Sequence, residues 1–208
     1  MQRVKTLGLA LVAVLALSGL AVSSASASLF LAHPTSGSFP ALILDININS
    51  KGEVSKHKFT TEAGKVVECT SAKSHGIAEF LRALTQKETV IYSECTAFGF
   101  VVSSVSPAEY EFSADLKVTQ LNTVIITVKS ITPCSVTVSP AGNANLDGVH
   151  YGSDPADPSR LIINALVKGI TAFIKGSECG KVGTTKTAEY VGQSLAWLEN
   201  GGKLGWDK

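Results

Sequence analysis

Most of the chain consists of short segments in which apolar and polar residues alternate. In the clearest one, residues 109–119, every second residue is apolar: Tyr110, Phe112, Ala114, Leu116 and Val118. A period of two places these side chains on one face of a β-strand and the polar ones on the other. Residues 124–129 and 134–139 repeat the pattern. The alternation therefore predicts three strands, each with one buried face, and it directs Cys134 into the apolar layer.

Further, weaker strand candidates are separated by turn signals rich in Gly, Pro, Asn and Ser. They are residues 41–48, 56–60, 65–70, 89–96, 98–104, 161–167, 169–175 and 185–191. Short strands with turns at this spacing are typical of antiparallel sheets packed face to face. We therefore predict an all-β fold, a single antiparallel β-sandwich or barrel-like domain. We expect residues 28–199 to form that domain and residues 200–208 to form a C-terminal tail.

Two segments do not follow the alternating pattern. Ile77, Phe80, Leu81 and Leu84 have the spacing of one helical face, so residues 77–84 form either one short helix or a continuation of the sheet. Residues 140–159 are rich in Pro, Gly, Asn and Asp and form the longest irregular stretch. Loops of this length within a domain are uncommon without a function, so we expect an exposed functional loop there.

The first 27 residues have the features of a signal peptide. Arg3 and Lys5 precede an apolar stretch at residues 7–20, and Ala25 and Ala27 form a small-x-small cleavage site. We therefore expect residues 1–27 to be cleaved, the mature protein to begin at Ser28, and the protein to be secreted. Neither a cysteine directly after the leader nor a second apolar run of about twenty residues is present, so we expect no membrane anchor.

Composition and charge narrow the classes of partner. Val, Ile, Thr and Ser are abundant, 18 residues are glycine, and Met1 is the single methionine, which favours strands and turns over long helices. Without the predicted leader, sixteen basic side chains face seventeen acidic ones, a net charge of −1. We therefore expect no nucleic-acid partner.

The four cysteines are Cys69, Cys95, Cys134 and Cys179. In an oxidising compartment an even number of thiols is expected to pair, and four cysteines allow three pairings. We favour Cys69 with Cys95 and Cys134 with Cys179, because sequential pairs join neighbouring strands most simply. A zinc site or a redox pair usually includes a C-x-x-C motif, and the gaps of 26, 39 and 45 positions contain none.

One segment has the spacing of a calcium loop. The oxygen-bearing side chains of Asn143, Asn145, Asp147 and Asp154 occupy positions 1, 3, 5 and 12, with Gly148 at position 6. The pattern departs from the motif at position 1, which is usually Asp, and at position 12, which is usually Glu. The alternative is that Asp147 and Gly148 make a hairpin turn and the asparagines are turn formers.

Other catalytic patterns are weak, and we assign no catalytic residue and no cofactor. The four histidines share no motif, and the nucleophile elbow G-x-S-x-G is absent from the sequence. The carboxylate pair of a glycosidase has no fixed sequence spacing, and Glu109 and Glu111 are explained as solvated charges on one strand face. Aromatic residues that a binding surface could use are Phe98, Phe100, Trp197 and Trp206.

Several cysteine and strand motifs support a family resemblance. They are Phe59, Gly64, Val66 to Cys69, Tyr92 to Gly99, Cys134 to Val138 and Gly176 to Cys179. In this layout the chain resembles a group of uncharacterised secreted actinobacterial proteins, over most of its mature length. The resemblance implies a secreted, β-rich, disulfide-bonded protein of bacterial origin and implies no activity or ligand.

These observations predict a non-enzymatic extracellular binding or structural module, whose partner is a cell-envelope component or an extracellular ligand. The alternatives are a secreted hydrolase, for example a glycosidase, and an inhibitor or toxin-like protein that presents residues 140–159. An enzyme should have a cleft where carboxylates or a histidine with shifted pKa values converge, and a binding module an exposed apolar or aromatic patch.

Overall fold

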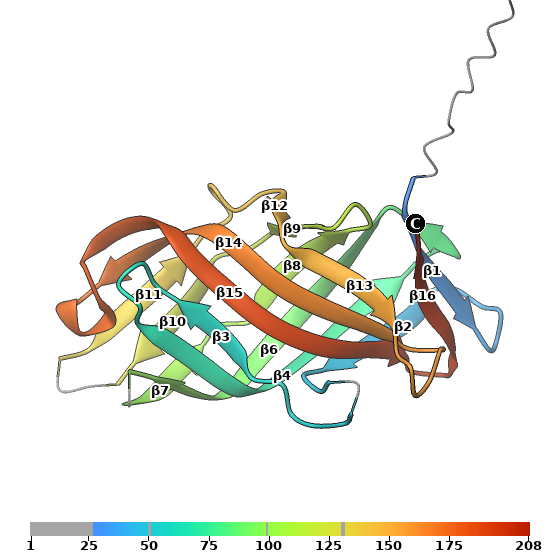
Figure 1. Ribbon diagram of the computed structural model, residues 1–208, viewed down its shortest axis with the longest axis horizontal. Coiled ribbons are helices and arrows are strands. Elements are labelled where there is room, and N and C mark those ends of the chain that lie inside the picture. Colours follow the sequence, from blue (N-terminus) through green and yellow to red (C-terminus); the bar gives the residue numbers. More distant parts are fainter. Residues whose placement is uncertain (1–26, 50, 99, 130–131) are drawn as a thin grey trace, which may run out of the picture.

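The computed structural model describes residues 27–208 except 50, 99 and 130–131, and strands make up nearly all of the regular structure in that part (Figure 1). The strands are β1 (Leu29–Pro34), β2 (Ala41–Ile46), β3 (His57–Thr60), β4 (Val66–Ala78), β5 (Arg82–Ala83), β6 (Thr85–Ala97), β7 (Phe100–Val105), β8 (Ala108–Ser113), β9 (Lys117–Gln120), β10 (Val124–Val128), β11 (Cys134–Val138), β12 (Leu146–Asp147), β13 (Val149–Ser153), β14 (Leu161–Lys175), β15 (Gly183–Leu198) and β16 (Gly202–Asp207). A 3-10 turn, η1 (Ser177–Cys179), joins β14 to β15. The fold is all-β, as the alternating pattern predicts.

A large antiparallel sheet surrounds one interior. Its strand order is β12-β9-β8-β6-β7-β10-β11-β14-β15-β2-β4-β3, and β4 also pairs with β6. Since β4 pairs with both β2 and β6, the sheet curls round so that strands distant in the order share an interior. Figure 1 shows the long strands β14 and β15 crossing in front of β6 and β8, a sandwich-like arrangement.

The predicted alternation is present where strands have one buried face. In β10, Val124, Ile126 and Val128 are buried, and the intervening residues are more exposed. In β11, Cys134, Val136 and Val138 are buried in the same way, as predicted for Cys134. Burying such a β-branched side chain stabilises the fold by roughly 1.5–3 kcal/mol relative to leaving it in water.

The predicted strand at residues 109–119 is instead a hairpin of β8 and β9. Tyr110 pairs with Gln120 and Phe112 with Val118 across it. Leu116 has a φ of 71°, and its amide donates to the Ser113 carbonyl at 3.1 Å, which makes a tight turn. The turn reverses the chain, so the inner side chains of both strands still face one interior.

Residues 140–159, expected to be an exposed loop, contain β12 and β13. Strand β13 pairs with the first half of β14, with Tyr151 opposite Ile163. The expectation of a protruding loop is therefore wrong over these strands. The Gly, Asn and Pro residues make the turns between them, and the backbone groups of β13 are used by the sheet.

The expected C-terminal tail, residues 200–208, is also wrong because it contains β16. This strand pairs with β1, and β1 pairs with β5, so that three strands form a small sheet at one end of the fold (Figure 1). Leu204 is buried, and the indole N–H of Trp206 donates to the Ala114 carbonyl at 2.8 Å. The end of the chain is thus part of the packed structure.

Residues 77–84 continue the sheet and do not form the alternative helix. They comprise the end of β4, a bend and β5. The Leu81 carbonyl accepts from the Ala32 amide at 3.0 Å, and Arg82 pairs with Leu31. Ile77, Phe80 and Leu84 are exposed, so the apolar residues at helical spacing do not pack against the core.

Two disulfides join elements of the sheet. Cys69 and Cys95 are opposite each other on β4 and β6, with Cα atoms 4.0 Å apart. Cys134 at the start of β11 bonds to Cys179 in η1, with Cα atoms 5.7 Å apart. These are the two sequential pairs that the sequence analysis favoured.

Residues 1–26 of the expected signal peptide lie outside the described part of the chain. Within the described part, no helix is long and apolar enough to cross a bilayer.

Candidate ligand site in the interior

The interior of the sheet contains a cavity of about 120 Å³. Its walls are mainly the inward side chains of alternating strand positions, among them Val90, Val118, Val124, Ile126, Ile163 and Val167. Most of these side chains are of medium size, and Ala165 and Gly192 on the inner faces of β14 and β15 are small. Short side chains facing inward from all sides leave the centre unfilled.

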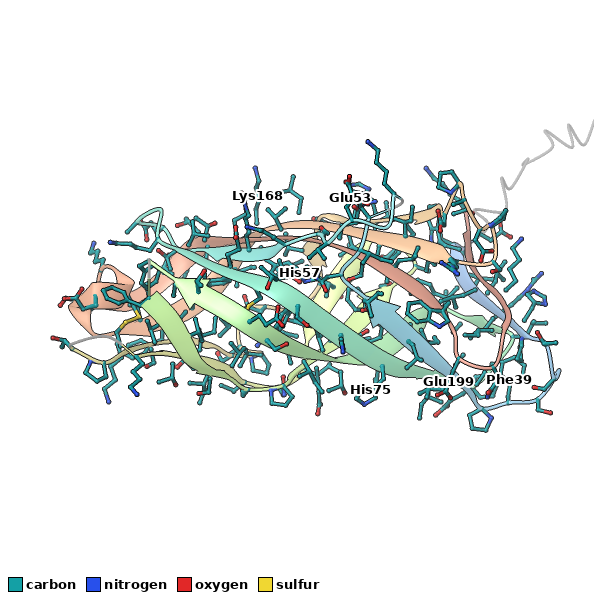
Figure 2. The ribbon with its side chains drawn as sticks, turned by 90° about the horizontal axis from the view of Figure 1, so that it is seen from below. Phe39, Glu53, His57, His75, Lys168 and Glu199 are labelled. Atoms are coloured by element: carbon teal, nitrogen blue, oxygen red, sulfur yellow. A yellow bond between two sulfur atoms is a disulfide. The ribbon has the colours of Figure 1, made fainter. Side chains whose placement is uncertain are left out.

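A line of polar side chains crosses this apolar interior. His57 on β3 lies within the strands, whereas His75 on β4 is at the periphery (Figure 2). The Nδ1 atom of His57 is 2.6 Å from the hydroxyl of Tyr190 on β15, and that hydroxyl is 3.0 Å from the hydroxyl of Tyr92 on β6. Tyr92 and Tyr110 on β8 also line the cavity. We call His57, Tyr190 and Tyr92 the polar chain.

The three members of the polar chain, and Tyr110, are held neutral. Burial lowers the pKa of His57, an effect that its hydrogen bond to the Gln193 carbonyl partly opposes. Burial also raises the pKa of Tyr92, Tyr110 and Tyr190, because an anionic phenolate is poorly solvated inside the sheet. At neutral pH the chain therefore offers only uncharged donors and acceptors.

Glycine at position 192 makes room for the polar chain. A Cβ atom there would lie 3.0 Å from the Nδ1 of His57 and 3.0 Å from the hydroxyl oxygen of Tyr190. Both contacts are tighter than a carbon normally makes, so a larger residue would displace the imidazole or the phenol. Glycine is therefore needed at position 192 for the space that its missing side chain leaves to His57 and Tyr190, and not for an unusual backbone φ.

Asp45 and Glu88 form a buried carboxyl pair beside the cavity, and Asp45 lines it. Ser74 donates to the Oε2 atom of Glu88 at 2.9 Å, and it lies opposite Asp45 in the pairing of β4 with β2. Burial and the adjacent Asp45 raise the pKa of Glu88 well above its usual value, and burial raises that of Asp45. Two acids in contact cannot both ionise easily, so the pair shares a proton.

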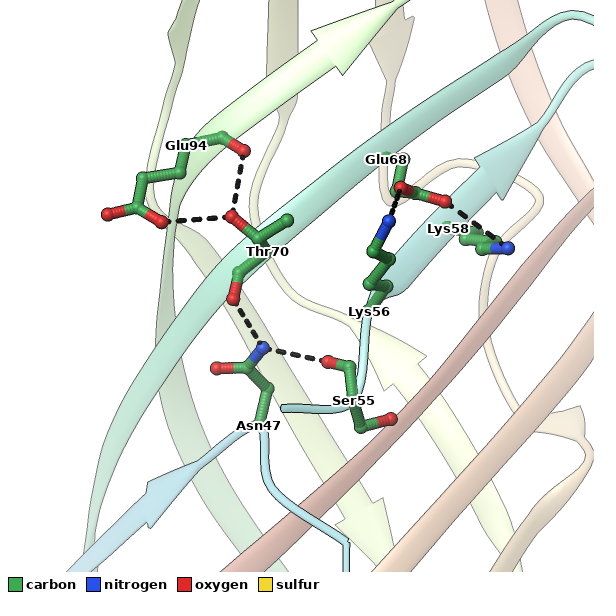
Figure 3. Close-up of polar contacts among 7 residues, drawn as sticks. All are labelled: Asn47, Ser55, Lys56, Lys58, Glu68, Thr70 and Glu94. Atoms are coloured by element: carbon green, nitrogen blue, oxygen red, sulfur yellow. Dashed lines mark hydrogen bonds and ion pairs between the residues drawn. The ribbon is translucent and has the colours of Figure 1, made fainter. Parts of the chain in front are cut away.

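The segment that leads into β3 is fixed by hydrogen bonds to β4 (Figure 3). The Nδ2 atom of Asn47 donates to the carbonyls of Ser55 at 2.7 Å and Thr70 at 2.9 Å. On the outer surface, the carboxylate of Glu68 contacts Lys56 and Lys58. These contacts position the start of β3, where His57 lies.

The candidate calcium ligands do not converge. Asn143 donates to the carbonyls of Ser139 and Thr171, and its own oxygen accepts from the Thr171 amide at 2.7 Å. Asp154 lies near the start of β14, where its amide donates to the Arg160 carbonyl, whereas Thr171 is near the end of that strand. At about 3.3 Å per residue, the two sites are on the order of 30 Å apart, so one ion cannot contact both.

The other two candidate ligands also have roles in turns and pairing. The amide of Asn145 donates to the hydroxyl of Thr119, and Asp147 pairs with Lys117 between β12 and β9. These contacts are those expected of turn-forming residues, the alternative to a calcium loop. In the described ranges, no group of three or more His, Cys, Asp or Glu side chains is placed to hold a metal ion.

The remaining residues considered from sequence lie away from the cavity. His33, His75 and His150 are exposed, as is Glu109, and Glu111 is paired with Lys87. The polar groups of the interior cannot be recognised as one site from the sequence, because the strands that carry them are far apart in the chain. Their sequence signal is a polar residue on the apolar face of an alternating strand: Asp45 follows Ile43 at a spacing of two, and Glu88 precedes Val90 in the same way.

Comparison with protein-family models, curated proteins and solved structures finds no match to this chain. The cavity and the polar chain are therefore the features from which a function can be inferred.

Proposed function

We propose that this protein is an exported, non-enzymatic binding module that holds a small, mainly apolar ligand in its interior cavity. The observation that carries the proposal is the cavity itself, which is mostly apolar and has a few polar groups on its walls. This combination is typical of ligand sites, in which apolar walls give affinity and a few polar groups give orientation. The two disulfides and the signal-peptide features of the N-terminal sequence support export.

The size of the cavity limits the ligand. An apolar cavity of about 150 Å³ in another protein binds benzene. At about 120 Å³, the cavity matches a single ring or a short aliphatic chain, and it is smaller than the 300–1,000 Å³ usual for drug-sized ligands.

Titratable groups with shifted pKa values do converge here, which is the feature expected of an enzyme, but their bonding favours a binding role. Both ring nitrogens of His57 are engaged, by Gln193 and Tyr190, so neither is available to accept a proton from a substrate. Of the two carboxyl groups only that of Asp45 lines the cavity, whereas a glycosidase places both of its carboxyl groups beside the sugar.

Exposed apolar side chains at one connection also favour a binding role. Ile77, Phe80, Leu81 and Leu84 are all exposed near the β4 to β6 connection. A binding role thus has two supporting features, of which the cavity is the one with defined chemistry.

Binding can be tested by titrating the purified protein with toluene and following the backbone amide signals by NMR. We expect saturable shifts at residues that line the cavity. Val167→Phe should abolish them by filling the cavity, and Leu166→Phe is the matched control, because Leu166 is the neighbouring residue of β14 and is 48% exposed. Ala165→Leu is a second filling variant should Val167→Phe fail to fold. Saturable shifts in neither the wild type nor the control would refute the proposal.

Export has a separate test, intact-mass measurement of the protein recovered from the culture medium with and without reduction. A mature chain that begins at Ser28 and gains four mass units on reduction is expected, because each disulfide takes up two hydrogens. Retention of residues 1–27, or free thiols before reduction, would refute export as a disulfide-bonded protein.

A further inference from the structure

We infer that the cavity selects a neutral ligand that carries a hydrogen-bond donor, a small phenol being the best match, and that the ligand donates to the side-chain oxygen of Gln120. This inference rests on the proposed function, since it names the ligand class of the same cavity.

The side-chain amide of Gln120 on β9 has a fixed orientation. Its Nε2 atom donates to the carbonyl oxygen of Asn122 at 2.8 Å and to that of Val138 at 2.7 Å. A carbonyl oxygen can only accept, so both hydrogens of the amide are used on the main chain. The reverse orientation would place Oε1 against two other oxygens. The Oε1 atom is therefore fixed as an acceptor.

This Oε1 atom faces the cavity without a donor. Among the described residues, none donates a hydrogen bond to it. Fully buried side-chain oxygens in that part of the chain all have a partner, so Oε1 must touch open space. Gln120 is 6% exposed and lines the cavity, as does Val118 on the same face of β9. By contrast, Asn143, the other carboxamide on the described wall, accepts from the Thr171 amide with its oxygen.

The other polar groups on the wall do not impose the opposite choice. The Nε2 atom of His57 lies 3.2 Å from the Gln193 carbonyl and therefore carries the proton of the neutral ring, so Nδ1 accepts from Tyr190. Tyr190 has then used its proton, and Tyr92 donates to it. The hydroxyl of Ser194 can rotate to donate or to accept, so it matches either kind of ligand. Among these groups, Gln120 distinguishes a ligand with a donor from one without.

The charge on the walls favours a neutral molecule. Among the described residues that line the cavity, none is lysine or arginine. A carboxylate or phosphate ligand would therefore be buried without a counter-charge, which is costly, and it has no hydrogen to donate to Gln120. A protonated amine would meet one carboxyl on the described wall, that of Asp45, and burial raises the pKa of that group. Its charge would thus be poorly compensated.

The apolar walls define the rest of the ligand. A cavity of about 120 Å³ has room for one ring. Val124 and Val138 both line it and pair across β10 and β11, and the Val138 carbonyl is one of the two that hold the amide of Gln120. The acceptor is therefore set in an apolar wall. An aromatic ring with a single hydroxyl fits the size, the walls and this acceptor.

Five ring compounds test the inference: phenol, anisole, toluene, benzoate and benzylamine. Phenol and anisole differ in whether the oxygen carries a hydrogen, so the ratio of their affinities reports on donation. This ratio should be about 3- to 10-fold higher in the wild type than in Gln120→Met, as expected for one buried hydrogen bond. Benzoate and benzylamine should bind more weakly than phenol.

Gln86→Met is the matched control and should keep the wild-type ratio. The Nε2 atom of Gln86 also donates to two carbonyls, those of Ile77 and Lys87, and Gln86 is 8% exposed. The described wall of the cavity does not include it. The two variants therefore lose the same kind of buried amide, and one of them loses the proposed acceptor.

A measurement on the wild type keeps the inference testable should Gln120→Met fail to fold. The side-chain amide signals of Gln120 in an NMR spectrum respond to a hydrogen bond at Oε1. Saturating phenol should shift them more than saturating anisole or toluene does. The side-chain amide signals of Gln86 should stay in place with all three compounds.

The outcomes separate this inference from the proposed function. Absence of binding by all five compounds would overturn both. The ligand class is wrong, and the cavity remains a binding site, if folded Gln120→Met keeps the wild-type ratio of phenol to anisole affinity. The same conclusion holds if the amide signals of Gln120 respond alike to phenol and anisole, or if benzoate or benzylamine binds as well as phenol.

Discussion

At the scale of single residues, the interior combines polar groups with apolar walls without leaving those groups unsatisfied. Throughout the described part of the chain, no buried side-chain nitrogen or oxygen lacks a hydrogen-bond partner. An unpaired buried polar group costs about 1–3 kcal/mol, so the polar chain is stable only as a complete set. Each side chain of the polar chain is hydrogen-bonded to its neighbour, and the missing side chain of Gly192 leaves the space that His57 and Tyr190 occupy.

The role of Gly192 gives the first prediction. Gly192→Ala should destabilise the protein by about 1–3 kcal/mol, because the new methyl group would press on His57 and Tyr190. Urea unfolding measures the change. Gly152→Ala is the matched control, since Gly152 is also within a strand and a Cβ there meets nothing within 4 Å. Equal stabilities of the two variants would show that the close approach at residue 192 has no energetic consequence.

At the scale of elements, the small sheet of β1, β16 and β5 covers one end of the interior (Figure 1). Phe30 of β1 packs edge-on against Tyr151 with ring centroids 4.9 Å apart, and Trp206 of β16 lies 5.8 Å from the same ring. These contacts join the two ends of the described chain to β13. The small sheet therefore depends on β16, a strand that the composition of residues 200–208 does not predict.

The second prediction concerns β16. Leu204→Ala should cost about 2–5 kcal/mol, as for other buried leucines, because Leu204 is 4% exposed. The exposed Leu166→Ala is the control and should change the free energy of unfolding by no more than about 0.5 kcal/mol. Both are measured by urea unfolding. A tail that contributes nothing to the fold would leave the two variants equally stable.

The third prediction compares the two disulfides. By the chain-entropy model, a loop of 26 residues contributes about 3.5 kcal/mol and one of 45 residues about 4 kcal/mol. Replacing Cys134 and Cys179 by serine should therefore destabilise the protein at least as much as replacing Cys69 and Cys95. Equilibrium unfolding of the two double variants gives the comparison. A much larger loss for the pair Cys69 and Cys95 would mean that native packing, and not loop closure, dominates.

Many of the strands were predictable from the sequence, because burial of one face of a strand makes every second residue apolar. The strands β10 and β11 follow that period without interruption. Gly169 shows where it fails: the sequence predicts two strands around it, but it has a φ of 76° and forms an irregularity within the single strand β14. A glycine with positive φ serves a turn and a bulge equally well, so sequence cannot distinguish them.

The candidate site was much less predictable. His57, Tyr92 and Tyr190 meet because β3, β6 and β15 face one interior, a relation set by pairing between strands over 90 residues apart in sequence. Local patterns contain no information on such pairing. By contrast, the spacing that suggested a calcium site is purely local, and the folded chain places Asn143 and Asp154 toward opposite ends of β14.

At the scale of the whole molecule, two buried groups oppose each other in the dependence of stability on pH. The pKa of His57 is lowered on folding from 6.5, so the unfolded chain binds more protons below that pH and stability falls as pH falls. The pKa of Glu88 is raised from 4.5, so above that pH the folded protein keeps a proton that the unfolded chain releases, and stability falls as pH rises. Between about pH 4.5 and 6.5 the two effects act in opposite directions.

This opposition gives the fourth prediction, in which each variant removes one effect. Glu88→Gln keeps a donor for Asp45 but cannot ionise, so its stability relative to the wild type should increase as pH rises from 4.5. His57→Gln cannot be protonated, so its stability relative to the wild type should increase as pH falls below 6.5. Urea unfolding at a series of pH values yields both trends, and Glu109→Gln, a change at an exposed carboxylate, serves as the control.

The slopes are informative even if each substitution changes stability by a constant amount, because only titration makes that change depend on pH. A Glu88→Gln profile parallel to that of the wild type would mean that the carboxyl pair titrates alike in the folded and unfolded states. The same result for His57→Gln would mean that the imidazole is solvated in the folded protein, and the neutral tautomer that accepts from Tyr190 would then lose its basis. The pH profile thus tests, without any ligand present, whether the titratable groups beside the cavity are neutral in the folded protein.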